Sequence, residues 1–186
     1  MVFTIVLSGY HPRCALDSTD GAEVRIDKIA RMIGECDWGV HDLSRVEVEL
    51  GALPRFNMPM ELGLHLGARL LGEPRHRRKR ALILDADPHR YDAALSDISG
   101  QDIESHGNDP DEAIRCVRNW LSDHRARGAR PLPGAGAMRE DYRLFNAELA
   151  TLLSPRRLDP ETLTHSDFVY AIHAWVQFRA DRELIG

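Results

Sequence analysis

Short apolar runs alternate with amphipathic helical segments in the first half of the chain, and this order limits the possible folds more than any other feature. The runs are VFTIVLS at 2–8, WGVHDLS at 38–44 and ALILDADP at 81–88. Apolar residues recur at helical spacing in 22–36 and 58–71, between the runs. Because parallel strands are joined through helical crossovers, this order predicts an α/β protein with a mainly parallel sheet, in a flavodoxin-like three-layer arrangement.

The rest of the chain is expected to be largely helical. Residues 91–103 have room for a short helix and a further strand, and 108–128 carries the start and stop signals of a helix. Pro and Gly then cluster in a linker at 129–138, after which helical spacing returns. We therefore predict an α/β nucleotide-binding domain over 1–128 and a helical appendage over 139–186, which packs on the sheet domain or forms a partner surface. The apolar face of its last helix comprises Phe168, Ile172, Trp175, Val176 and Phe178.

The composition excludes several classes of protein. With 186 residues, 43% hydrophobic and 28% charged, the chain fits one globular domain with an appendage. A net charge of −5 gives no reason to expect nucleic acid as a partner. The three cysteines show no Cys-x-x-Cys spacing, which argues against a disulfide framework or a zinc site and fits a reducing cytosol. No apolar run approaches the roughly 18 residues of a membrane span, and the first residues lack the pattern of a signal peptide. We expect a cytoplasmic protein that makes no use of a membrane.

Ligands of open parallel sheets lie beyond the carboxyl ends of the strands. This rule selects the residues that end each predicted strand. A helix that follows a strand also begins at this edge, which adds the start of the 58–71 helix. The predicted ligand-binding residues are Ser8, Gly9, Tyr10, Asp42, Ser44, Asn57 and Asp85.

Glu61 is the acid expected in the first turn of the 58–71 helix, on the same face as Asn57. The positive end of the helix favours an ionised carboxylate by roughly 0.3–1 kcal/mol. Such a carboxylate suits the oxocarbenium-like state of N-glycosidic bond cleavage. An acid at this position is also common as a capping partner of helix amides, and that structural interpretation stays open.

A combined pattern over 35–88 resembles nucleoside 2-deoxyribosyltransferases and TIR-like nucleotide-binding proteins. It consists of an apolar run ending in Asp-Leu-Ser at 42–44, then Asn-x-x-x-Glu-Leu-Gly at 57–63 with a helix rich in small residues, then the apolar run at 81–88. The resemblance covers less than half of the chain and leaves the helical tail unassigned. Met58, Pro59 and Met60 and the polar insertion at 45–56 depart from the usual pattern, which puts the substrate in doubt more than the fold.

In the families it resembles, the helix glutamate is the catalytic carboxylate, a role that carries over to Glu61 alone. Asn57 and Asp42 match ligand-orienting positions, and residues 8–10 match a substrate loop less closely. The resemblance implies a protein that cleaves or transfers at the N-glycosidic bond of a nucleotide, a nucleoside or NAD. NAD or a nucleotide would then be a substrate, and no cofactor is required.

Two other groups of residues have a functional and a structural interpretation. Arg13 can hold a phosphate through a bidentate contact, or be merely solvated. RHRRKR at 75–80 can attract a polyanion, but it joins a helix end to a strand start on the side opposite the predicted ligand edge, which favours a solubilising turn. Asp42, Asp85 and Asp87 are of the residue type that binds Mg²⁺, but no histidine pattern supports them, so we predict no metal.

Two alternatives to an enzyme remain open. In the first, the same pocket binds a nucleotide without turnover, and the helical tail from 139 reports its occupancy to a partner. In the second, the chain is a self-assembling module that forms homo-oligomers, as TIR-like domains often are.

Overall fold

The computed structural model describes residues 1–183 except 18–19, 45–55, 89, 94 and 99. The chain divides into two compact units. The helical unit contains residues 1–12, 16–19 and 117–186, and the sheet unit contains residues 13–15 and 20–116. The contacts thus assign residues 1–12 and 117–128 to the helical unit, whereas the sequence analysis placed them with the sheet. Most of the predicted insertion at 45–56 lies outside the described residues.

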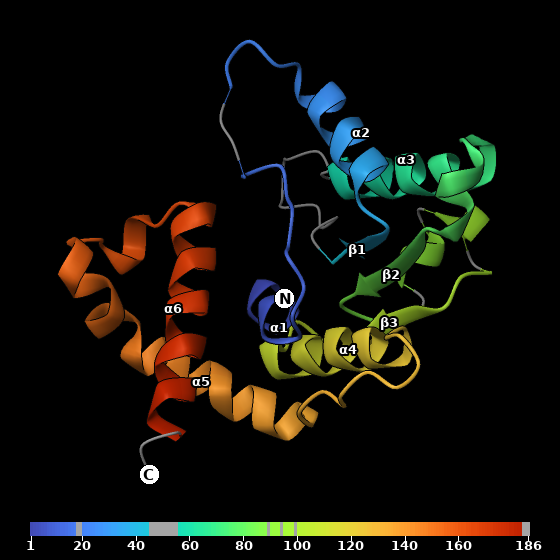
Figure 1. The fold of residues 1–186 in the computed structure, drawn as a ribbon. Helices are drawn as coiled ribbons and strands as arrows, with labels where there is room; N and C mark the ends of the chain where they lie inside the picture. The colour runs from blue at the N-terminus through green and yellow to red at the C-terminus, as the bar shows by residue number, and fades with distance from the viewer. Residues whose placement is uncertain (18–19, 45–55, 89, 94, 99, 184–186) are drawn as a thin grey trace. The chain divides into compact units, whose positions relative to one another are not determined.

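The sheet unit contains a three-stranded sheet in the order β1-β2-β3 (Figure 1). Its strands are β1 (Trp38–Asp42), β2 (Arg80–Asp85) and β3 (Ile103–Ser105), and both pairs are parallel. Asp42 pairs with Leu84, and Asp85 pairs with Ser105, so the carboxyl ends of the three strands meet at one edge. The predicted α/β class with a parallel sheet is therefore confirmed.

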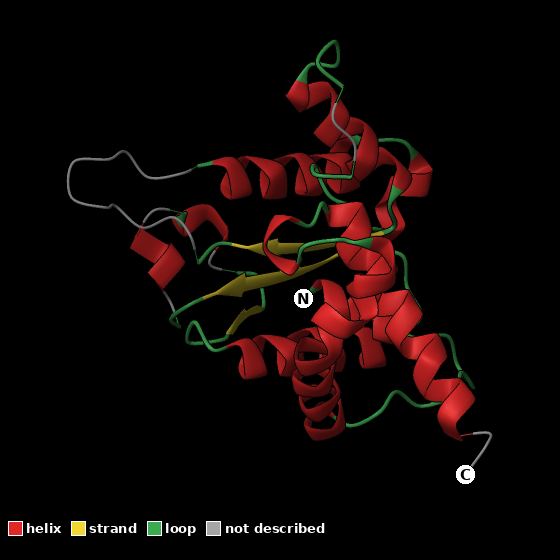
Figure 2. Ribbon diagram, turned by 90° about the vertical axis from the view of Figure 1, so that its left-hand side faces the viewer, coloured by secondary structure: helices red, strands yellow, loops and turns green. Residues whose placement is uncertain are grey.

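Helix α3 (Asn57–Leu71) connects β1 to β2 and lies along one face of the sheet (Figure 2). Its inner side packs Leu62 against Leu43, Ile83 and Tyr91. Helix α2 (Arg25–Glu35) packs on α3. Because parallel strands β1 and β2 are joined through α3, the helix starts at the carboxyl edge of the sheet. The shorter elements of the unit are the 3₁₀ helices η1 (Pro74–Arg78), η2 (Arg90–Ala93) and η3 (Ser96–Ile98).

The predicted first strand at 2–8 is wrong, because these residues form helix α1 (Val2–Leu7). A short apolar run fits a buried strand and a buried helix equally well, so tertiary packing decides between them. Here the ring of Phe3 packs against Tyr142, Phe145 and Trp175 at centroid distances of 5.3, 5.2 and 5.7 Å. Burial of this ring among other aromatic side chains favours the helix.

The predicted substrate loop at 8–10 is the C-terminal cap of α1. Gly9 has φ of 84°, and its amide donates to the carbonyl of Val6 at 2.9 Å. The amide of Tyr10 donates to the carbonyl of Ile5 at 3.1 Å. This pair of bonds is a Schellman motif, in which glycine adopts the left-handed conformation at little cost. Ser8, Gly9 and Tyr10 therefore end a helix of the helical unit and do not follow a strand of the sheet.

The helical unit is built from α1, α5 (Ala135–Leu153) and α6 (His165–Glu183), with the 3₁₀ helices η4 (Ser154–Arg156) and η5 (Pro160–Thr162) between the last two. Helix α4 (Pro110–Asp123) crosses from the sheet unit into this unit at Val117. The predicted apolar face of the last helix is largely confirmed, since only Phe178 is exposed. None of the helices in the described part of the chain combines the length and the apolar character needed to cross a membrane.

Candidate functional site

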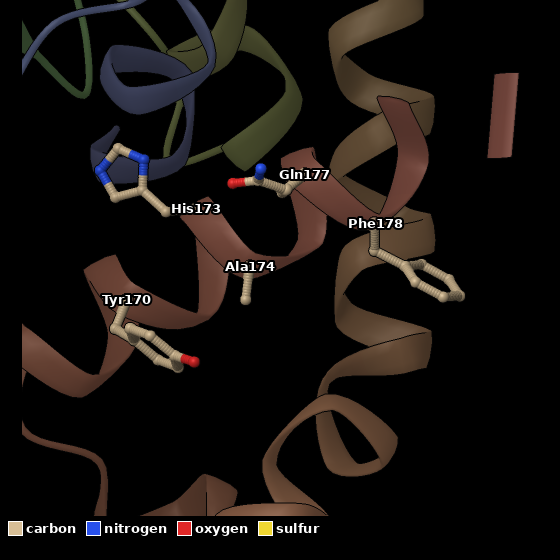
Figure 3. Close-up of a pocket in the computed structure, with 5 residues that line it drawn as sticks. All are labelled: Tyr170, His173, Ala174, Gln177 and Phe178. Atoms are coloured by element: carbon tan, nitrogen blue, oxygen red, sulfur yellow. The ribbon is translucent and has the colours of Figure 1, made fainter. Parts of the chain in front are cut away.

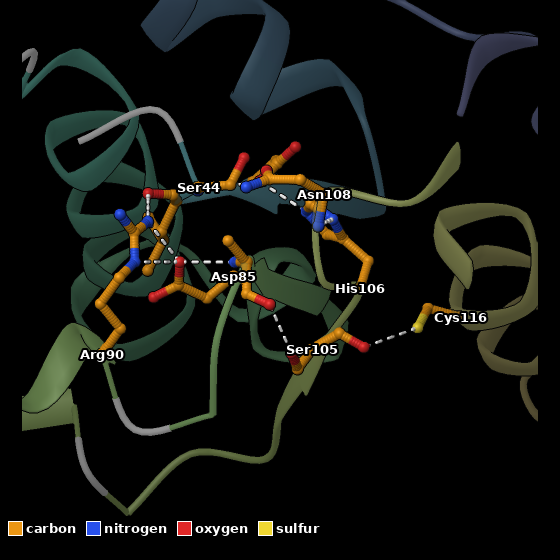
Figure 4. Close-up of polar contacts among 10 residues, drawn as sticks. Ser44, Asp85, Arg90, Ser105, His106, Asn108 and Cys116 are labelled. Carbon is orange, nitrogen blue, oxygen red and sulfur yellow. Dashed lines mark hydrogen bonds and ion pairs between the residues drawn. The ribbon is translucent and has the colours of Figure 1, made fainter. Parts of the chain in front are cut away.

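Polar side chains gather where the three strands of the sheet end. Asp42 ends β1, Asp85 ends β2, and His106 directly follows β3. Figure 4 shows the polar contacts around Asp85, Arg90 and His106 at this edge. This edge of the sheet is the candidate site.

Asp42 and His106 form a carboxylate–imidazole pair between the two outer strands. The Asp42 Oδ1 and His106 Nε2 atoms are 3.3 Å apart. His106 is buried, and its Nδ1 accepts the amide of Asn108 at 3.1 Å. Because Nδ1 accepts, the ring proton of neutral His106 lies on Nε2 and is donated to Asp42. The pair therefore has a fixed tautomer.

The environment of Asp42 favours its ionised form. Burial raises the pKa of this carboxyl group, but hydrogen bonds from Ser44 and His106 outweigh burial and hold the pKa below its usual value of 3.8. One of these bonds runs from the Ser44 amide to Asp42 Oδ1 at 2.9 Å. Asp42 is thus an anion at neutral pH.

Asp85 and Arg90 form a buried ion pair at the same edge. Asp85 is 1% exposed, and its Oδ1 accepts from the Arg90 Nε at 2.9 Å, from the Arg90 Nη2 and from the Ala86 amide at 2.7 Å. The Arg90 Nη2 also donates to the carbonyl of Leu43 at 2.9 Å. Arg90 thereby ties the end of β1 to the end of β2. Asp85, which we predicted to bind ligand, has its charge compensated by Arg90 and helps to hold the two strand ends together.

The turn after β3 presents His106 to the edge. Gly107 and Asn108 both have φ of 56°, a left-handed conformation that non-glycine residues seldom adopt. Asp109 accepts the amide of Asp111 at 2.9 Å and caps α4. Ser105 is tied down by its hydroxyl, which donates to the carbonyl of Ala86 at 2.6 Å. His106 is the site residue that the sequence analysis missed.

Glu61 lies on α3, next to α2. The helix begins at Asn57, so Glu61 falls beyond the first turn, where the helix dipole acts only weakly. Burial raises the pKa of Glu61, and the opposing effect of the Arg25 charge is smaller. The prediction that Glu61 lies in the first turn is therefore wrong, and the surroundings of Glu61 raise its pKa instead of lowering it.

The structure separates the predicted site residues into three places. Asp42, Ser44 and Asp85 lie together at the sheet edge. Asn57 and Glu61 lie near the start of α3, and between described residues the structure gives Glu61 no hydrogen bond or ion pair with the three edge residues. Residues 8–10 belong to the helical unit, where the carbonyl of Ser8 accepts from Arg125 at 3.0 Å. Arg13 pairs with Glu35 at 3.3 Å.

A hollow of about 410 Å³ lies in the helical unit, on the surface of α6 (Figure 3). Tyr170, His173, Ala174, Gln177 and Phe178 line it, and all belong to this one helix. It brings together no group of acids or histidines. The sheet edge therefore remains the stronger candidate for chemistry.

Comparison with known proteins adds no assignment. No family model matches this chain, and neither a curated protein nor a solved structure does. We therefore infer function from the residues of the sheet edge and of α3.

Proposed function

We propose that the sheet unit binds a nucleoside or nucleotide at the carboxyl edge of its sheet and cleaves or transfers at the N-glycosidic bond, with Glu61 as the catalytic carboxyl group. The observation that carries the proposal is the position of α3, which carries Glu61 and starts at the sheet edge where Asp42 ends β1. The pKa shifts of the two carboxyl groups support it. The pKa of Glu61 is raised and the pKa of Asp42 is lowered. Two acids whose pKa values are pushed apart suit an acid and an anion in one reaction.

The raised pKa of Glu61 changes the role that the resemblance implies. A carboxyl group whose pKa is raised is better suited to donate a proton than one with an unshifted pKa. In the proposed reaction Glu61 gives its proton to the leaving base as the bond from C1′ to nitrogen breaks. The electron pair of that bond leaves with the base, and the Asp42 anion stabilises the positive charge on the sugar. Water or an acceptor base then attacks C1′ and returns a proton to Glu61.

This chemistry favours nucleosides over NAD as the substrate class. The base of a nucleoside is a poor leaving group until it is protonated, so a general acid accelerates its departure. The nicotinamide of NAD carries a positive charge already and leaves without a proton. Release of base from deoxynucleosides should therefore depend more strongly on Glu61 than release of nicotinamide from NAD.

The experiment measures release of free base from deoxynucleosides and from NAD by chromatography. We expect Glu61→Gln to lower turnover of the deoxynucleosides by about 10²–10⁴, the usual contribution of a general acid. Glu73→Gln is the matched control, because Glu73 is exposed and its ion pair with Arg75 lies at the surface. Unchanged activity in Glu61→Gln, or the absence of any released base, would remove the proposal.

A second candidate is a sensor that binds a nucleoside or nucleotide without turnover. Asp42 is already paired with His106 and Asp85 with Arg90, so the edge is satisfied without a reacting substrate. Thermal stabilisation by deoxynucleosides without released base, retained in Glu61→Gln, would favour this candidate.

A further inference from the structure

His41 on β1 and His65 on α3 form a buried pair between strand and helix. The two residues are 6% and 2% exposed. Their ring centroids are 5.1 Å apart, and the ring planes meet at 73°, edge to face. The pair lies inside the sheet unit, and the proposed reaction does not use it.

The nitrogens of this pair are poorly satisfied. Both ring nitrogens of His41 and the Nε2 of His65 are buried, and no described residue forms a hydrogen bond with them. A polar group buried in this way costs free energy, of the order of 1–3 kcal/mol in mutational data. Burial of two such rings in one contact lowers the stability of the fold, so a purely structural contact would be better made by apolar side chains. We therefore look for a function in the uptake of a proton by these rings.

Gly39 lets both rings pack directly on the backbone of β1. A Cβ at position 39 would lie 2.6 Å from His41 Nε2 and 2.8 Å from His65 Nδ1. Such contacts are impossible, so any side chain at position 39 would force the rings to move. The fit of the pair between α3 and β1 therefore depends on this glycine.

The charges near the pair oppose a proton. The pKa of both His41 and His65 is lowered to about 4, mainly by burial, and further by each ring's charged neighbours. Those neighbours are His65 for His41, and Lys79 and Arg69 for His65. The one favourable contribution is a hydrogen bond of His65 with the backbone of Arg80. The same two cations oppose a metal ion at His65, which argues for a proton-binding rather than a metal-binding role.

The surrounding elements place little negative charge near the pair to compensate a proton on either ring. Lys79 is 3% exposed and is fixed by bonds from its Nζ to the carbonyls of Ile33 and Cys36. Asp37 acts on Lys79 and not on the histidines. Arg25 of α2 acts on Glu61. Packed against α3, η1 contributes only basic side chains: Arg75, His76, Arg77 and Arg78.

We propose that the His41–His65 pair is an acid-sensitive latch that holds α3 on β1 when both rings are neutral and releases α3 when either ring takes up a proton. An imidazolium in this contact gains a second N–H donor without an acceptor among the described residues. A proton on His65 also repels Lys79 and Arg69, and a proton on His41 repels a proton on His65. Opening brings the ring into water and relieves both penalties. Helix α3 also carries Asn57 and Glu61, so release would dismantle the proposed site; this consequence alone rests on the proposed function.

The expected effect follows from the pKa of each ring in the closed and open states. A ring with pKa of about 4 when closed and 6.5 when open contributes its full stability above pH 6.5 and loses it progressively as the pH falls towards 4. Between pH 7 and pH 5, the opening equilibrium of α3 should rise about 20-fold if one ring titrates and about 500-fold if both do.

Amide hydrogen exchange along α3, corrected for the intrinsic pH dependence of exchange, measures this opening. In the unmodified protein we expect protection of the α3 amides to fall by these factors between pH 7 and pH 5. In the double variant His41→Leu/His65→Leu the extra loss should disappear, because no ring remains to titrate. His173→Leu is the control, since His173 is exposed on α6, and it should behave like the unmodified protein.

Titration of the histidine ring protons by NMR keeps the proposal testable if the double variant does not fold. In the unmodified protein, the rings of His41 and His65 should stay neutral at pH 5.5. Titration of both rings near pH 6.5 with α3 still protected would overturn the latch. If α3 stays protected at pH 5, the latch is refuted, whether or not base release is lost at that pH. If the protein releases no base at any pH but α3 loses protection as expected, the catalytic proposal fails and the latch stands.

Discussion

The two units of the chain bury different kinds of side chain. The helical unit has an apolar core in which Phe3, Phe145 and Trp175 are at most 2% exposed. Its buried polar residues are Thr4 and Ser8, which carry no charge. Among the described residues, the buried lysine, aspartate and histidine residues lie in the sheet unit: Lys28, His41, His65, Lys79, Asp85 and His106.

This difference indicates where function lies. Burial of an ionisable group costs free energy unless partners compensate it, whereas aromatic side chains stabilise simply by leaving water. The helical unit forms a stabilising apolar core. The sheet unit is less stable than it would be with an apolar interior, because it buries charged and titratable groups. Such groups concentrate at functional sites, in agreement with the proposed site at the sheet edge.

The largest effect is expected in the core of the helical unit. Phe145 is fully buried and packs against Phe3 and Trp175. Phe145→Ala should lower the free energy of unfolding by about 4 kcal/mol, the usual loss for a buried aromatic ring. Chemical denaturation measures this loss, and Phe178→Ala is the control because Phe178 is 47% exposed. A loss below about 1 kcal/mol in Phe145→Ala would contradict the description of this unit as a packed core.

A smaller but still substantial effect is expected from the buried ion pair of the sheet unit. Asp85→Ala removes the carboxylate that accepts from the Arg90 Nε and from the Ala86 amide, and it leaves the Arg90 charge without its anionic partner Asp85. Removal of one partner of a buried pair costs several kcal/mol, and we expect about 3 because Arg90 is partly exposed. Asp87→Ala is the matched control, since Asp87 is exposed two residues further on. Equal stability of the two variants would show that Asp85 is not structural and would restore it as a ligand-binding residue.

The comparison also shows which parts of the fold could be predicted from the sequence. Helices α2, α3 and α4 and strands β1 and β2 have the length and periodicity of their class, so their existence and order could be predicted. The run at 2–8 has no periodicity that distinguishes a strand from a helix. Its structure is decided by the rings of Tyr142, Phe145 and Trp175, more than 130 residues away, which pattern alone does not reveal.

Part of the candidate site could also be predicted from the sequence. Asp42, Ser44 and Asp85 lie at the predicted edge because each directly follows an apolar run. His106 follows a strand of only three residues, Ile103–Ser105, which is too short to stand out as an apolar run. The His41–His65 pair gave no signal either, because a histidine in a strand and another in a helix are brought together only by the fold.

The smallest effect on stability is expected from Glu61→Gln. This variant tests whether the sheet unit holds Glu61 for chemistry or for stability. Because burial raises the pKa of Glu61, the folded state disfavours its charge, and this penalty grows as the pH rises above 4.5. Glutamine removes the charge, so at pH 7 the variant should be as stable as the unmodified protein or more stable, within about 0.5 kcal/mol. Thermal denaturation at pH 7 and pH 4 measures this difference, which should shrink at the lower pH. Clear destabilisation of the variant at pH 7 would show that the ionised carboxylate supports the helix, as a plain capping residue does. Unchanged stability with lost turnover would instead mark Glu61 as a residue kept for chemistry.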